Sequence, residues 1–165
     1  MKIRALLPVA ILLLVTSPLF AGPPWITVEL PPNPFDQASR GAFVLVHAFH
    51  YSSDGGGDPV VGRAVGLVDG QRRSVTLSFE RTSRPGVFAL KNSWGDKGEW
   101  TLVITNQQES HGGGAAEIMV RVSGNRVIGV EAATKPSKSA ELPLEPRRFT
   151  DAEIEASLRN RSAAD

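Results

Sequence analysis

Between residues 25 and 132 the apolar residues alternate with polar ones in short segments, with the period of two that is typical of β-strands. The alternation is clearest where apolar residues occupy positions 75, 77 and 79, positions 100, 102 and 104, and positions 118, 120 and 122. Gly, Pro, Asn, Asp and Ser residues separate the segments. The pattern predicts strands near residues 25–30, 42–51, 60–68, 74–80, 87–91, 99–106, 116–123 and 127–131.

The alternation gives each strand one apolar and one polar face, as in antiparallel sheets packed face to face. Two dipeptides, Asp69-Gly70 and Gly124-Asn125, supply the residues that tight hairpin turns require. Seven or eight strands at this spacing predict an all-β fold, an immunoglobulin-like antiparallel β-sandwich. An up-and-down β-barrel is the alternative.

The composition changes after residue 132. Residues 133–146 contain three prolines and two lysines without an apolar period, which predicts a linker. Thr150 and Glu153 then have the spacing of a capping box, in which each residue's side chain serves the other's backbone amide at the start of a helix. The third segment of the chain, residues 133–165, is therefore expected to be a linker followed by a short helix.

Ile154 and Leu158 are four residues apart in this expected helix and so share one face. One interpretation is a helix that frays in solution, because isolated helices of this length are marginally stable. The other is a docking element that lays Ile154 and Leu158 on a partner or on the sandwich.

Residues 1–21 have the features of a secretory signal peptide. Lys2 and Arg4 precede an apolar run at residues 5–15, residues 16–18 break that run, and Ala21 is a small residue at the cleavage position. An uncleaved anchor is the alternative, although four prolines interrupt the charge-free residues 5–24. Cleavage would leave residues 22–132 as a domain in the periplasm or secreted, with no attachment to a membrane.

The charge balance argues against nucleic acid as a partner. The chain has 18 Lys and Arg against 17 Asp and Glu, and removal of Lys2 and Arg4 with the signal leaves 16 against 17, a net charge of −1. A protein that binds nucleic acid through phosphate contacts needs a basic excess. The absence of Cys from the sequence excludes disulfides, thiolate metal sites and a Cys nucleophile.

The sequence also lacks the local signatures of common enzymes. It contains no G-x-S-x-G, H-E-x-x-H or G-x-x-x-x-G-K-[ST] motif. The glycine runs at residues 55–57 and 112–114 have no following Lys, so they do not resemble phosphate-binding loops. We therefore expect a protein that is not an enzyme.

Histidine and carboxylate residues offer one route to a metal site. His50 closes the second expected strand, Asp54 and Asp58 flank the glycines of the following connection, and His111 lies in a later connection. In an immunoglobulin-like sandwich these connections gather at one end, where the four side chains would hold Cu²⁺ or Zn²⁺. The simpler interpretation is a solvated loop with surface histidines and no cofactor.

Three tryptophans raise the question of an aromatic contact surface. Trp100 alternates in phase with Leu102 and Ile104, which predicts a core position. Trp94 lies in the polar segment Asn-Ser-Trp-Gly-Asp and is the candidate for an exposed contact with a partner. The competing interpretation is that Trp94 covers the open end of the sandwich.

Three segments resemble a known family. Residues 85–90 (P-G-V-F-A-L) and 97–104 (K-G-E-W-T-L-V-I) resemble the "G-V-Y … G-x-W-T-L-x-V" ending of YtkA-like and related bacterial Ig-like domains. Residues 59–64 (P-V-V-G-R-A) resemble the "P-V-x-G-A" element of the same domains. The resemblance implies an extracytoplasmic β-sandwich, in some cases associated with copper handling or respiratory assembly.

Two functions follow as expectations. The first is a non-catalytic binding or accessory module outside the cytoplasm that contacts a protein or glycan partner. The second is a periplasmic protein that binds Cu or Zn through the loop-end His and Asp residues.

Overall fold

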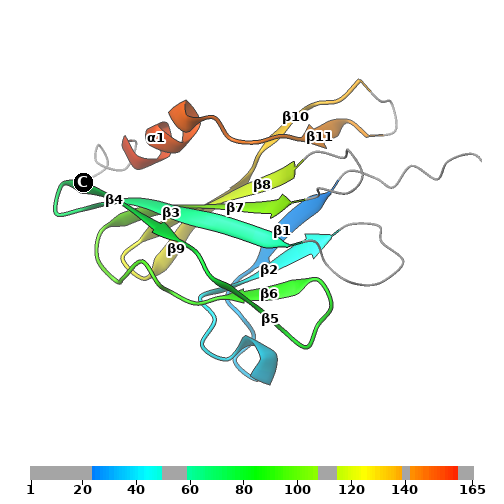
Figure 1. Ribbon diagram of the computed structural model, residues 1–165, viewed down its shortest axis with the longest axis horizontal. Coiled ribbons are helices and arrows are strands. Elements are labelled where there is room, and N and C mark those ends of the chain that lie inside the picture. Colours follow the sequence, from blue (N-terminus) through cyan, green and yellow to red (C-terminus); the bar gives the residue numbers. More distant parts are fainter. Residues whose placement is uncertain (1–23, 50–58, 108–114, 139–141, 160–165) are drawn as a thin grey trace, which may run out of the picture.

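The computed structural model describes residues 24–49, 59–107, 115–138 and 142–159, and within them the chain forms two antiparallel sheets that pack face to face (Figure 1). The first sheet has the order β1-β2-β6-β5, formed by Trp25–Glu29, Val44–Phe49, Val87–Leu90 and Phe79–Arg81. The second has the order β4-β3-β7-β8-β9, formed by Gln71–Thr76, Val60–Val68, Glu99–Gln107, Ala115–Ser123 and Arg126–Ala132. A short 3₁₀ helix, Gln37–Ser39, lies between β1 and β2.

The predicted all-β sandwich is confirmed. The order β1-β2-β6-β5 is the A-B-E-D sheet of an immunoglobulin-like fold, and β3-β7-β8 is its C-F-G sheet. Strands β4 and β9 extend the second sheet at its two edges. In the described part of the chain, no helix is long and apolar enough to cross a membrane.

The core between the sheets is built from the alternating apolar positions. Trp100, Leu102 and Ile104 of β7 point into it and are almost completely buried, as the alternation predicts. Val44 and Val46 of β2 belong to the same cluster from the opposite sheet. Burial of these side chains is the main stabilising contribution that a sandwich without disulfides has available.

The strand expected at residues 74–80 is in fact two strands in different sheets. β4 pairs with β3 as far as Thr76, and β5 begins at Phe79 in the first sheet. Between them Leu77 donates a backbone hydrogen bond to the carbonyl oxygen of Gly62 (3.0 Å) and points into the core. The chain passes from the second sheet to the first between β4 and β5. The apolar alternation continues through this crossing because Leu77 and Phe79 both face the core from the edge of the sandwich.

Small residues on the inner side of β3 make room for large neighbours. Gly62 lies against Leu77 and Phe79, and Gly66 lies directly beneath the indole ring of Trp100. The Trp100 indole nitrogen donates a hydrogen bond to the carbonyl oxygen of Lys97 (2.8 Å), which fixes the ring in this place. The absence of a side chain at position 66 is therefore a packing requirement of the core.

The segment that we interpreted as a linker contains regular structure. β10 (Thr134–Pro136) and β11 (Leu144–Pro146) form a two-stranded antiparallel sheet, which an ion pair between Lys135 and Glu145 spans at 3.0 Å. The chain then runs back to helix α1 (Asp151–Arg159), which lies on the outer face of the second sheet (Figure 1). The sequence analysis did not predict these strands, because two three-residue strands with prolines have no recognisable apolar period.

A candidate binding groove under the C-terminal segment

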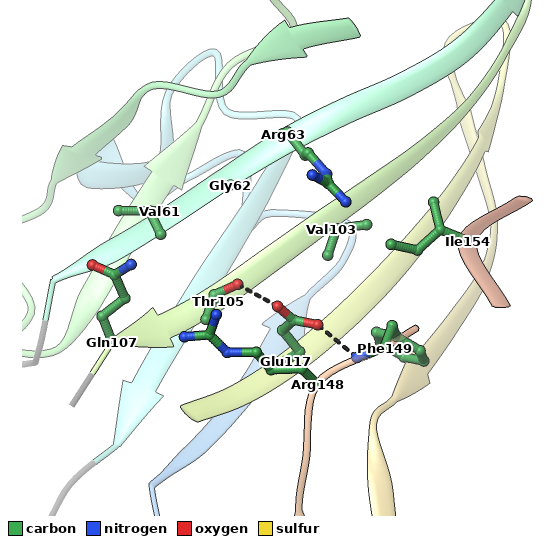
Figure 2. Close-up of a pocket in the computed structure, with 10 residues that line it drawn as sticks. All are labelled: Val61, Gly62, Arg63, Val103, Thr105, Gln107, Glu117, Arg148, Phe149 and Ile154. Carbon is green, nitrogen blue, oxygen red and sulfur yellow. Dashed lines mark hydrogen bonds between the residues drawn. The ribbon is translucent and has the colours of Figure 1, made fainter. Parts of the chain in front are cut away.

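A groove of about 370 Å³ lies on the outer face of the second sheet, between its strands and the segment that leads into α1 (Figure 2). The floor comes from β3, β7 and β8, and the wall comes from residues 148–154. The residues that line it are Val61, Gly62, Arg63, Val103, Thr105, Gln107, Glu117, Arg148, Phe149 and Ile154.

The floor of the groove follows from strand alternation. Val103, Thr105 and Gln107 are every second residue of β7, so they share the outer face while the residues between them enter the core. Val61 occupies an outer position of the neighbouring strand β3. Val103 packs with Phe149 and Ile154 in an apolar cluster on this outer face. The floor therefore combines apolar valines with a hydroxyl and an amide.

Glu117 is a buried carboxylate on β8 beside this floor, with 8% of the residue exposed. Its Oε1 accepts a hydrogen bond from the Thr105 hydroxyl (2.9 Å), and its Oε2 accepts one from the backbone N–H of Phe149 (2.7 Å). A buried carboxylate needs such donors to offset the loss of water. Glu117 thus connects the sheet to the C-terminal segment (Figure 2).

Apolar packing holds the same segment against the sheet. Ile154 is 3% exposed and Leu158 is 2% exposed, and both belong with Phe149 to a cluster on the outer face. The sheet contributes Val65, Val103 and Met119 to this cluster. Of the two interpretations of the C-terminal helix, docking on the sandwich is the one observed.

Ile154 and Leu158, which the sequence offered as contacts to a partner, are therefore buried against the sandwich instead of exposed. Their side chains are covered by the protein's own sheet, and this docking removes their apolar surface from water. A hydrogen bond of 2.7 Å between the hydroxyls of Thr101 and Ser157 joins the two elements as well.

The capping box at the start of α1 is confirmed. The Thr150 hydroxyl accepts a hydrogen bond from the Glu153 backbone N–H (3.3 Å), and the Glu153 carboxylate accepts one from the Thr150 backbone N–H (2.8 Å). Arg147 adds two hydrogen bonds to the same carboxylate, at 2.6 and 2.9 Å. Hydrogen bonds from Arg147 and Thr150 lower the pKa of Glu153 from 4.5 to about 2.

Acidification from about pH 4.5 to pH 2 is expected to loosen the start of α1. The lowered pKa of Glu153 means that its contribution to stability is complete above pH 4.5 and is lost as the pH falls toward 2. Amide hydrogen exchange of residues 151–159, corrected for its intrinsic pH dependence, measures this. Glu153→Gln is expected to weaken protection at neutral pH and to remove this pH dependence, and an unchanged profile in that variant would contradict the assignment.

Two arginines extend over the groove. Arg63 projects from β3, and Arg148 projects from the C-terminal segment on the other side (Figure 2). Arg63 forms an exposed ion pair with Asp151 (3.3 Å), of the kind that contributes little stability. Arg148 is exposed, and no ion pair within the described residues involves it. Guanidinium groups beside the valines of this mixed floor suit a carboxylate attached to an apolar group.

Trp94 does not form the exposed contact that we expected as one possibility. It is 6% exposed and packs edge to face against Phe43, with ring centroids 5.1 Å apart. The backbone N–H groups of Trp94 and Gly95 donate hydrogen bonds to the side chain of Asn92. These bonds stabilise a turn in which the indole ring points into the core. The competing interpretation, in which Trp94 covers one end of the sandwich, agrees with this position.

The candidate metal ligands His50, Asp54, Asp58 and His111 lie outside the described residues. Within the described ranges, no group of three or more His, Cys, Asp or Glu side chains is placed to hold a metal ion. The Cu²⁺ or Zn²⁺ site stays a prediction that rests on the sequence.

The sequence analysis missed the groove residues Glu117, Arg148 and Phe149. One signal for Phe149 was present, because an apolar residue before the capping Thr150 often packs against the fourth residue of the helix, here Ile154. No comparable signal marked Glu117, which occupies an ordinary polar position of an alternating strand.

Searches against family models, curated proteins and solved structures found no match to this chain. The resemblance to YtkA-like domains therefore stays a prediction from the three quoted segments. In the fold these segments lead into β3, β6 and β7.

Proposed function

We propose that this chain is a non-catalytic binding module that works outside the cytoplasm and holds a protein partner in the groove between β3, β7 and the C-terminal segment. The observation that carries the proposal is the position of the Arg63 and Arg148 side chains at a groove whose floor contains Val61 and Val103. Paired hydrogen bonds from arginine to a carboxylate are among the strongest that a protein surface offers.

The chemistry of the groove favours a peptide over a glycan as its occupant. Val61, Val103 and Phe149 accept an apolar side chain, and the two guanidinium groups accept a carboxylate. A protein segment with an acidic residue next to an apolar one supplies both groups, whereas a neutral glycan supplies neither. Both oxygens of Glu117 already accept hydrogen bonds, which supports a structural role for this carboxylate.

The location outside the cytoplasm rests on residues 1–21, whose charge and apolar pattern are those of a cleaved signal. We expect the protein recovered from its cells to begin at Gly22, which the mass of the intact chain measures. A recovered chain that keeps residues 1–21 would contradict this part of the proposal.

Arg148→Glu tests the groove. We expect this change to weaken partner binding at least about tenfold, because it replaces a charged donor worth roughly 1.5–3 kcal/mol with a repelling carboxylate. The binding of acetyl-Glu-Leu-amide and acetyl-Gln-Leu-amide, followed by amide NMR shifts of Thr105, Gln107 and Phe149, measures the preference for a carboxylate.

The matched control is Arg73→Glu, the same charge reversal at an exposed position of β4 that does not line the groove. This control is expected to bind the glutamyl peptide, and any protein captured from the cell envelope, as the natural chain does. Equal binding by the Arg148 and Arg73 variants would exclude the groove as the binding site.

A further inference from the structure

The second sheet ends in an open edge strand with apolar side chains. β9 spans Arg126–Ala132 and pairs with β8, and within the described ranges no strand pairs with its other side. Ile128 is 46% exposed and Val130 is 41% exposed. An unpaired edge of this length is a template for another strand, and proteins usually protect such edges with charges or cover them.

A bulge in β9 places its two charged residues on one face. Arg126 pairs with Ser123 and Glu131 pairs with Met119, both of which are outer positions of β8. Residues five apart would point to opposite faces of a regular strand. The register shift opposite Arg121 and Val122 inserts one extra residue, which brings Arg126 and Glu131 to the same face.

The same shift places Val127 and Val130 together on the inner face, opposite Val122 and Val120. The two ends of the strand therefore have the same arrangement. Each end has one charged residue, Arg126 or Glu131, followed toward the middle of the strand by a valine. A segment with this symmetry complements a second copy of itself.

We propose that two copies of this chain associate through antiparallel pairing of their β9 edges. The two-fold axis passes between Ile128 and Gly129, so that Arg126 lies opposite Glu131 of the partner subunit and Val127 lies opposite Val130 of the partner subunit. A two-fold axis perpendicular to a sheet requires that opposed residues share a face, and the bulge meets this requirement for both pairs.

Charge complementarity identifies a second copy as the occupant. The Arg126–Glu131 contact forms twice in the symmetric pair, and neither residue takes part in an ion pair within the described part of the chain. A strand from an unrelated protein would need the same spacing of charges to gain both contacts. Two seven-residue strands bury less than a standard interface, so the dimer is expected to depend on concentration.

Sedimentation velocity of the whole recovered chain, from low micromolar to near millimolar concentration, tests the pairing. The natural chain is expected to dimerise over this range. Arg126→Glu and Glu131→Arg, each alone, place like charges opposite each other twice and are expected to weaken dimerisation about tenfold. The double variant with both changes is expected to restore it.

An equimolar mixture of the two single variants gives an independent test, because each variant supplies the charge that the other lacks. We expect the mixture to form heterodimers under conditions where each variant alone is monomeric, and circular dichroism confirms that each variant is folded. A monomeric natural chain at all concentrations, dimerisation that is insensitive to the single changes, or failure of both the double variant and the mixture would overturn the proposal.

Discussion

Gly66→Ala is expected to lower the free energy of unfolding by about 3 kcal/mol, at the upper end of the range for overpacking a core. A Cβ at this position would lie 2.5 Å from Cδ2 of Trp100 and 2.7 Å from the carbonyl oxygen of Glu99. The indole ring has little freedom to move away, because its nitrogen is bound to Lys97 and its faces are enclosed by the core. The strand or the ring must therefore shift, and either shift disturbs the centre of the sandwich.

Urea unfolding of Gly66→Ala against the natural chain measures this effect. Gly129→Ala is the matched control, since it is also a glycine-to-alanine change within a strand of the same sheet. Its Cβ would meet Nε of Arg121 at 2.8 Å, the far part of a flexible side chain that can turn aside. We expect a change below about 1 kcal/mol for this control at low micromolar concentration. Equal effects at both positions would contradict the assigned role of Trp100.

The strands of the sandwich were predictable because one apolar and one polar face leave a direct mark on the sequence. The strand at residues 60–68 was predicted at its observed bounds, and Trp100 was placed correctly in the core. The crossing at Leu77 was not predictable from alternation. Leu77 and Phe79 keep the same apolar phase before and after the chain changes sheets.

The binding groove depends on contacts between residues far apart in the sequence, and these leave no local pattern. Glu117 contacts Phe149 across 32 positions, and neither residue type alone indicates the other. Trp94 was difficult for a related reason, because its polar neighbours form a turn whose hydrogen bonds point the indole inward. Sequence patterns predicted the two sheets of this protein. The residues that form the wall of its groove could be identified only from the folded structure.

Leu158→Ala is expected to weaken docking of the C-terminal segment by about 3 kcal/mol, within the range for removing a buried leucine side chain. Leu158 is 2% exposed and shares its cluster with Val65 and Met119 of the sheet, so the change leaves a cavity that the rigid sheet cannot fill. Hydrogen exchange of residues 147–159 measures the effect as faster exchange of this segment. Leu144→Ala, at a position that is 45% exposed, is the matched control and is expected to change little.

The same variant separates the two roles of the C-terminal segment. Phe149 and Ile154 form the wall of the groove, so a loosened segment should also weaken binding of the glutamyl peptide. Arg148→Glu should weaken that binding without faster amide exchange of α1. The Arg148 side chain is exposed and does not belong to the apolar cluster that holds α1 on the sheet. If Leu158→Ala accelerates exchange but leaves peptide binding intact, then the wall does not contribute to the site, and the partner must bind to the sheet alone.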